Sequence, residues 1–342
     1  LHSTSRRQRQ MCIRDRYLSG TPFKALADGR FSEEQIYNWS YVDEQRAKRD
    51  FDGEGFNVYE ALPELQMFTY QISLMLEGEL RKGAAITEDG SSMDYAFDLN
   101  EFFSVNDPAA VTPMFKYKDD VTKFLNALTT NEKYPFSTEE LREELPHTIW
   151  LLDRVASAKA MAKMLKEHPV FGEYKIVLAA GDGKLDEDEE AKNAFDEVRR
   201  AIEENPKTIT LSVGQLTVGV TVPEWTGILM LSNMKSPSSY MQAAFRVQNP
   251  YETTVIRDGK PRRVRKDRAY VFDFDPARTL IIFDEFANNL RSGTASGGGT
   301  AEDRKENIRE LLNFFPVLGE DKQGKMVEID AQAVLSIPRR LK

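Results

Sequence analysis

Among the 342 residues of this sequence, Gln242 and Arg246 have the types and spacing best suited to chemistry. They follow Ser236-Pro237, a typical helix start in which serine is the N-cap and proline takes the first helical position. A spacing of four residues places both side chains on one face of the predicted helix. A guanidinium is always charged, and its fork of N–H donors matches phosphate oxygens. The two side chains can therefore act on one ligand.

The segment before this helix brings small residues to a turn between two predicted strands. A β-rich run over 208–213 leads to Thr217, Gly219 and Thr221, and residues 227–231 form a second buried run. Glycine lets a backbone approach a ligand closely, because it carries no Cβ. The two threonine hydroxyls are candidate contacts to that ligand.

This order of strand, glycine turn, strand and Gln/Arg helix resembles motifs V and VI of superfamily 2 helicases and translocases. It is most similar to the helicase (Res) subunits of type III-like restriction systems, over about residues 17–315. The resemblance implies that ATP and Mg²⁺ bind between this lobe and a preceding one. Arg246 would stabilise charge on the transferred phosphoryl group and Gln242 would orient it. Gly219, Thr221 and Arg246 would contact the nucleotide.

The resemblance also implies contacts to nucleic acid. Residues 17–22, YLSGTP, are similar to motif III, which couples the ATP site to the nucleic-acid face in that family. Ser19 and Thr21 are its hydroxyl donors, and Thr217 is a further candidate contact. Taken alone, the same residues would be read as a strand that ends in a proline turn.

A dense basic stretch, Arg257 to Arg268, follows the predicted Gln/Arg helix. Two interpretations stay open for it. It is a solvated hairpin, or it is a phosphate-contacting loop in which Arg262, Arg263 and Arg265 bind nucleic acid and binding weakens with salt.

Alternation of strands with helices from His147 onward predicts an α/β fold with a mostly parallel, doubly wound sheet. The resemblance identifies this part as a RecA-like lobe, the second lobe of a helicase. The expected strands are 147–152, 174–180, 208–213, 227–231 and 269–274. Farther upstream, residues 31–49 are expected to form a helix that Ser32 caps, Ser137 is expected to cap another, and 65–76 fit either a strand or a helix.

The chain divides into five expected segments. Residues 6–16, RRQRQMCIRDR, resemble the translation of a transposase-based sequencing adapter, so residues 1–16 are expected to be an artefact. The alternative for this stretch is a basic arm that binds nucleic acid. The other segments are the end of a first RecA-like lobe with a connector (17–82), an inserted, mainly helical subdomain (83–146), the second RecA-like lobe (147–291), and a linker with a truncated C-terminal extension (292–342).

Composition excludes several classes of protein. The formal net charge is −9, and it becomes −13 without residues 1–16, which argues against non-specific wrapping of nucleic acid. The single cysteine, Cys12, lies in the adapter-like stretch, so no disulfide framework or thiolate metal site is expected. His147 and His168 are isolated, and no metal site is expected. No apolar run is long enough to span a membrane, and a cytoplasmic location is expected.

Three other patterns look like phosphate or metal motifs. Residues 181–184, GDGK, lack the spacing of a Walker A motif and precede an acidic run, so they are expected to be a loop. Residues 280–285 resemble a Walker B motif, but an amphipathic helix that begins at Asp275-Pro276 fits better. Asp273 and Asp275 are expected to end a strand and cap this helix, and not to serve as nuclease carboxylates.

Two functional hypotheses remain. The first is the motor-lobe fragment of an ATP-dependent DNA helicase or translocase of a restriction system, acting on single- or double-stranded DNA with methyltransferase or nuclease domains or subunits. The fragment alone is expected to be inactive, because it lacks Walker A and Walker B motifs. The alternative is a non-catalytic nucleic-acid-binding module. Asn249 and Thr221 favour it, since the family usually has an arginine and an acidic residue at these positions.

Overall fold

The structure is a computed structural model that describes residues 39–76, 98–179, 187–213, 221–257, 260–291, 293–294, 298–321 and 325–336. Ser19, Thr21, Thr217 and Gly219 lie outside these ranges, as do the adapter-like residues 6–16 and the loop at 181–184.

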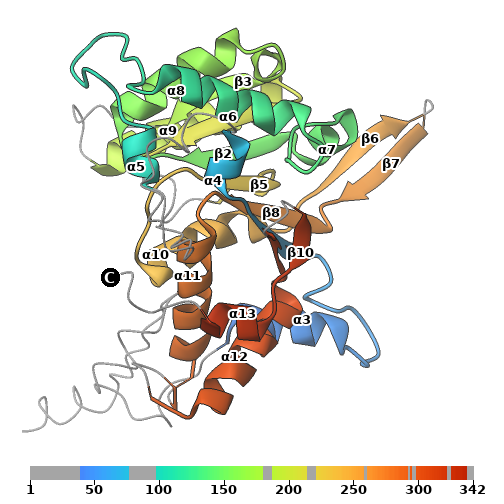
Figure 1. Ribbon diagram of the computed structural model, residues 1–342. Coiled ribbons are helices and arrows are strands. Elements are labelled where there is room, and N and C mark those ends of the chain that lie inside the picture. Colours follow the sequence, from blue (N-terminus) through green and yellow to red (C-terminus); the bar gives the residue numbers. More distant parts are fainter. Residues whose placement is uncertain are drawn as a thin grey trace, which may run out of the picture.

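The centre of the molecule is an eight-stranded sheet with the strand order β10-β9-β1-β8-β5-β2-β4-β3 (Figure 1). Every neighbouring pair is parallel except β9 and β10. The α/β class with a mostly parallel, doubly wound sheet is therefore confirmed. The strands are β1 (Glu64–Thr69), β2 (His147–Leu151), β3 (Lys175–Ala179), β4 (Thr208–Ser212), β5 (Gly227–Met230), β8 (Arg268–Asp273), β9 (Val317–Glu320) and β10 (Met326–Glu328).

Helices cover both faces of this sheet, because the strands are apolar on both sides. Along β2, Ile149 and Leu151 join one buried cluster, whereas Trp150 and Leu152 join the other, as the alternation of a strand requires. The first cluster includes buried residues of α3 (Tyr41–Arg49), α9 (Glu187–Glu204), α10 (Pro237–Ala244), α11 (Pro276–Asn289), α12 (Ala301–Phe314) and α13 (Ala331–Ser336). The second includes those of α4 (Ile72–Met75), α5 (Leu99–Phe102), α6 (Lys118–Thr130) and α8 (Val155–Glu167).

The sheet extends beyond residues 147–291 in the sequence. The stretch 65–76, which periodicity alone leaves undecided, forms strand β1 and then the short helix α4. Strand β1 pairs with β8 on one side and β9 on the other, so it lies inside the sheet. Strands β9 and β10 come from the expected C-terminal extension. The described parts of 83–146 are mainly helical, with α5, α6 and α7 (Glu139–Glu144).

Of the two predicted helix caps, Ser137 is wrong and Ser32 lies outside the described residues. The α7 cap is Thr138 and not Ser137, because the Thr138 hydroxyl accepts a hydrogen bond from the Leu141 backbone N–H, while the Ser137 hydroxyl donates to the Tyr134 carbonyl. Helix α3 starts at Tyr41 behind a complete capping box of Ser40 and Asp43. Ser32, the expected cap, is not among the described residues.

Residues 280–285 belong to helix α11, whose N-cap is Asp275 with Pro276 in the first turn. The prediction of an amphipathic helix is therefore correct, and the Walker B interpretation is excluded. Shortly after this helix, Thr294 lies within the stretch whose composition predicts a flexible linker. Thr294 is buried, donates a hydrogen bond to the Asn288 carbonyl, and accepts one from Asn307 of α12. The chain at this position is thus held between α11 and α12.

The first residue of β2, His147, gives the fold a pH dependence. Its Nδ1 lies 3.0 Å from the Thr208 hydroxyl of β4, and burial lowers the pKa of His147 to about 4. The unfolded chain has the ordinary pKa of about 6.5. The unfolded state therefore binds the proton first, and stability is lost as pH falls from about 6.5 towards 4.

We expect this protonation to cost about 3 kcal/mol of unfolding free energy near pH 4. Urea unfolding of the wild type and His147→Gln at a series of pH values measures it. The difference in unfolding free energy between the two proteins should shift in favour of the variant by that amount between pH 7.5 and 4. A difference that does not change with pH would contradict the prediction, whatever the other titrating groups contribute to both proteins.

Candidate functional site

The predicted Gln/Arg helix begins as expected and ends differently. Helix α10 has Ser236 as its N-cap, which accepts a hydrogen bond from the Ser239 N–H, and Pro237 in its first turn. The α-helix stops at Ala244, and Phe245–Gln248 form a 3₁₀ helix, η4, that carries Arg246. The next residues explain this ending. Asn249 donates a hydrogen bond of 2.9 Å to the Arg246 carbonyl, and a residue before proline disfavours the α conformation.

The change of helix type alters the relation between Gln242 and Arg246. In a continuous α-helix, residues four apart differ by about 40° around the axis. With the last two steps in 3₁₀ geometry, the difference becomes about 80°. The prediction that both side chains share one face of a single α-helix is therefore wrong in detail. They project from adjacent sectors of one α–3₁₀ segment, and both are half-buried.

Arg246 is held in place by its neighbours in η4. Phe245 stacks on Tyr41 of α3 with ring centroids 5.6 Å apart, and Val247 is fully buried. The Gln248 side chain donates a hydrogen bond of 3.2 Å to Glu44, which also belongs to α3. Burial lowers the pKa of Arg246, but a guanidinium stays protonated at neutral pH. The result is a partly desolvated cation on a fixed backbone, which binds an anion more strongly than a fully solvated one does.

The other predicted site residues fall into two groups. Thr221 is exposed, and it follows the undescribed residues 214–220. Arg262, Arg263 and Arg265 lie on strand β7 (Lys260–Arg265), which pairs with β6 (Glu252–Arg257) in a separate antiparallel hairpin. The solvated-hairpin interpretation is correct about the conformation, since every β7 residue is exposed. The structure does not place these three arginines beside Arg246.

Sequence inspection missed Lys266, a buried lysine that connects the segment after Thr221 to the base of the hairpin. Its Nζ donates hydrogen bonds to the carbonyls of Pro223 (2.6 Å) and Trp225 (2.9 Å). Its backbone N–H donates to the carbonyl of Tyr251, at the base of the hairpin. Burial lowers the pKa of Lys266 to about 7, against a smaller opposing effect of Glu224. Lys266 thus ties the segment after Thr221 to the segment after Arg246. The only signal in the sequence was its place in a basic run.

A second polar cluster, also missed, lies under the start of α10. Asp273 at the end of β8 is fully buried and accepts hydrogen bonds from the Tyr240 hydroxyl (2.7 Å) and the Arg278 guanidinium (2.7 Å). It also accepts one from the backbone N–H of Asp275, the α11 cap. The expectation that Asp273 and Asp275 end a strand and cap a helix is confirmed. The cluster fixes α10 against the sheet and α11.

Asn233 connects this cluster to the inserted helices. Its side-chain oxygen accepts hydrogen bonds from Arg278 and from the backbone N–H of Leu99, the first residue of α5. Its side-chain nitrogen donates to Asp98, and its backbone N–H donates to Asn100. The loop between β5 and α10 is therefore attached to α5 at one residue.

The donor groups of Arg246 and Gln242 suit a phosphate better than a metal ion. The guanidinium of Arg246 and the amide of Gln242 are suited to phosphate oxygens. No group of three or more His, Cys, Asp or Glu residues in the described ranges could hold a metal ion.

In the same ranges, no helix is both long and apolar enough to cross a membrane.

Comparison with known proteins finds one curated relative by sequence and several solved structures. No family model matches the chain. A Mycoplasma pneumoniae protein, described as "Putative type II restriction enzyme and methyltransferase RM.MpnORF110P C-terminus", is 26% identical over 328 residues. The alignment covers 91% of this chain and 44% of that relative, so the chain spans less than half of the relative's length.

Solved structures found in the comparison include the ATP-dependent type ISP restriction-modification enzyme LlaBIII bound to DNA (TM-score 0.35, 13% identity, 81% of this chain and 15% of that chain). They also include domain 2 of the DEAD-box helicase Mss116p bound to an RNA duplex (TM-score 0.33, 11% identity, 72% and 68%). A third is Saccharomyces cerevisiae Dbp5 bound to RNA and ADP BeF₃ (TM-score 0.32, 12% identity, 86% and 60%). The curated relative is thus described as a restriction enzyme and methyltransferase, and the solved structures are similar to this chain only at TM-scores below 0.5.

Proposed function

We propose that this chain is a motor lobe of an ATP-dependent DNA helicase or translocase that belongs to a restriction system. The observation that carries the proposal is the setting of Arg246. It is a half-buried cation on a short helix that follows strand β5 and α10, and the side chains of Phe245 and Gln248 in that helix contact α3. The similarity to the M. pneumoniae relative over most of this chain supports the link to restriction.

In this proposal, ATP with Mg²⁺ binds between this lobe and a first RecA-like lobe. Arg246 stabilises the negative charge that develops on the transferred phosphoryl group, and Gln242 orients that group. Gly219 and Thr221 contact the nucleotide. The phosphate-binding lysine and the carboxylates that hold Mg²⁺ belong to the first lobe, because this sequence has no Walker A or Walker B motif. Ser19, Thr21 and Thr217 contact the nucleic acid, and methyltransferase or nuclease domains or subunits are the expected partners.

The proposal is tested by measuring phosphate release from ATP by the full-length protein, with and without DNA. We expect DNA-stimulated turnover in the full-length protein and no turnover above background in residues 17–342 alone, since this part of the chain lacks the Walker A and Walker B residues that bind the phosphates and Mg²⁺. Robust DNA-stimulated turnover by residues 17–342 would show that the phosphate ligands lie within this chain. Absence of turnover in the full-length protein would remove the motor function.

The basic hairpin is the proposed DNA contact of this lobe. Replacing Arg262, Arg263 and Arg265 with alanine should weaken binding to all sequences alike and reduce the slope of log K against log salt by up to about 3. The reduction should be smaller than that limit, because Arg263 is paired with Glu252 and Arg265 with Asp267 and Glu60.

The matched control removes the same charge elsewhere. Lys159, Lys163 and Lys166 are exposed on α8, and their triple alanine variant should leave the salt slope unchanged. Anisotropy titrations of a labelled DNA at several salt concentrations measure both variants. An equal change of the salt slope in both variants would mean that only net charge affects binding. The hairpin would then be a solvated surface element that does not contact DNA.

A second candidate function is a nucleic-acid-binding module that has lost hydrolysis. The side-chain amide of Asn249, at the position of the usual second arginine, donates to the carbonyl of Arg246 and therefore caps η4. An intact, DNA-binding full-length protein without ATP turnover would favour this candidate over the motor.

A further inference from the structure

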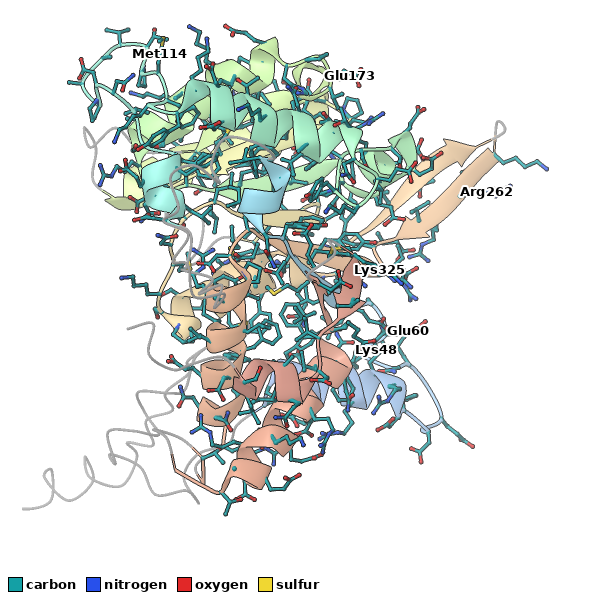
Figure 2. All side chains as sticks on the ribbon, in the orientation of Figure 1. Lys48, Glu60, Met114, Glu173, Arg262 and Lys325 are labelled. Atoms are coloured by element: carbon teal, nitrogen blue, oxygen red, sulfur yellow. The ribbon has the colours of Figure 1, made fainter. Side chains whose placement is uncertain are left out.

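The hairpin of β6 and β7 stands apart from the main sheet. It forms a sheet of its own, with six paired positions from Glu252–Arg265 to Arg257–Lys260. Figure 1 shows it projecting from the body as a two-stranded ribbon, and Figure 2 places Arg262 near its outer end. Six residues at about 3.3 Å each give the ribbon a length of about 20 Å. Every residue of β7 is exposed, and no described side chain of the ribbon belongs to a buried apolar cluster, so its ordered strands need another reason.

The base of this ribbon is fixed, which distinguishes it from an ordinary surface loop. Lys266 donates from its backbone to Tyr251 and from its buried Nζ to the carbonyls of Pro223 and Trp225. Arg265 makes ion pairs with Asp267 (2.9 Å) and Glu60 (3.2 Å). A ribbon anchored in this way holds its direction relative to the lobe.

The two faces of β7 both carry cations but differ in their other side chains. Side chains alternate along a strand, so Lys260, Arg262 and Val264 point to one face and Arg263 and Arg265 to the other. On the second face the arginines are paired with Glu252, Asp267 and Glu60. The first face combines Lys260 and Arg262 with the exposed apolar side chain of Val264, and the β7 sequence KPRRVR contains no carboxylate. In a protein with a net charge of −9, this is a local basic surface.

The dimensions and the chemistry fit one ligand class. The major groove of B-DNA, about 12 Å wide and about 8.5 Å deep, admits a two-stranded β-ribbon. Arginine and lysine pair with guanine edges there, and apolar side chains contact thymine methyl groups. We propose that the β6–β7 ribbon enters the major groove of double-stranded DNA through the face of Lys260, Arg262 and Val264. This deepens the proposed function, because it makes duplex DNA the substrate of the lobe.

Binding without ATP tests this inference separately from the motor function. Three DNA probes are compared. The first is a plain duplex of about 20 base pairs, which is roughly two helical turns, and the second is one of its strands. The third is the same duplex with glucosylated hydroxymethylcytosines, whose sugars fill the major groove. Glucose adds no charge, so phosphate contacts are unchanged. We expect the full-length protein to bind the plain duplex at least about tenfold more tightly than either the single strand or the filled duplex.

The variant Lys260→Ala/Arg262→Ala should lose most of this preference, so that its affinities for the plain and the filled duplex agree within about threefold. The variant Lys159→Ala/Lys163→Ala, which removes equal charge from α8, should keep it. Equal wild-type affinities for plain and filled duplex would overturn the groove proposal. An unchanged preference in the ribbon variant would overturn it too, and so would a preference for the single strand.

The same variants test whether the ribbon binds a second copy of the protein instead of DNA. If the ribbon variant changes the oligomeric state in light scattering while its DNA preference stays at the wild-type value, the ribbon is an interface between copies. ATP turnover plays no part in these outcomes. A full-length protein that binds duplex through the ribbon without hydrolysing ATP would therefore contradict only the motor function.

Discussion

Replacing Arg246 with alanine is expected to lower the DNA-stimulated ATP turnover of the full-length protein by about 10³-fold or more, the usual effect of losing an arginine that reaches a transferred phosphoryl group. Nucleotide binding should change little, because the guanidinium matters most when charge develops in the transition state. Steady-state turnover and a nucleotide-binding titration on the same preparation measure the two effects. Asn249 cannot compensate, since its amide is bonded to the carbonyl of Arg246.

Two further variants make the result specific. Arg246→Lys should fail nearly as badly, because an ammonium cannot reproduce the fork of a guanidinium. Arg200→Ala, which removes an exposed arginine from α9, should keep wild-type turnover. If Arg246→Ala keeps near wild-type turnover while folded, Arg246 has no role in hydrolysis. If it binds ATP poorly and unfolds at a lower denaturant concentration, the residue is structural.

The largest effect on stability is expected at Asp273. Asp273→Ala should reduce the unfolding free energy by about 3–5 kcal/mol, the usual cost of leaving one partner of a buried ion pair without the other. Arg278 would keep its charge in an almost fully buried position, and the Tyr240 hydroxyl would lose its acceptor. Urea unfolding followed by circular dichroism measures the loss as a lower midpoint at constant m-value.

Two controls separate the lost charge from the lost side chain. Asp273→Asn keeps the shape and one acceptor oxygen, so it should cost less than the alanine variant. Asp153→Ala, at an exposed carboxylate after β2, should stay within about 0.5 kcal/mol of the wild type. A loss below about 1 kcal/mol in Asp273→Ala would mean that water reaches Arg278, and that the cluster does not hold α10 in place.

Local signals in the sequence were sufficient for most elements of the lobe. The strands expected at 147–152 and 269–274 are observed at His147–Leu151 and Arg268–Asp273, and the start of α10 lies where Ser236-Pro237 predicts it. Buried runs and helix caps are properties of a few consecutive residues, so they can be recognised without the rest of the chain. The choice of a helix over a Walker B motif at 280–285 was settled in the same way, by its cap and its helical spacing.

The end of the candidate site was less predictable. The spacing of Gln242 and Arg246 assumed a continuous α-helix, whereas the chain tightens into η4. That change depends on the Asn249 amide reaching back to a carbonyl and on the contacts of Phe245 and Gln248 with α3, which is some 200 residues away in the sequence. A local pattern contains no information about contacts of this kind.

The sequence by itself determined the α/β class, most strands of the lobe, and the residue types available for phosphate chemistry. Only the tertiary structure decided that β1 lies between β8 and β9, that Lys266 joins the segments after Thr221 and Arg246, and that Asp273 balances a buried Arg278. The physical reason is that strand neighbours pair through backbone groups that every residue has. A buried charge, in turn, is explained only by the partner that packing brings to it.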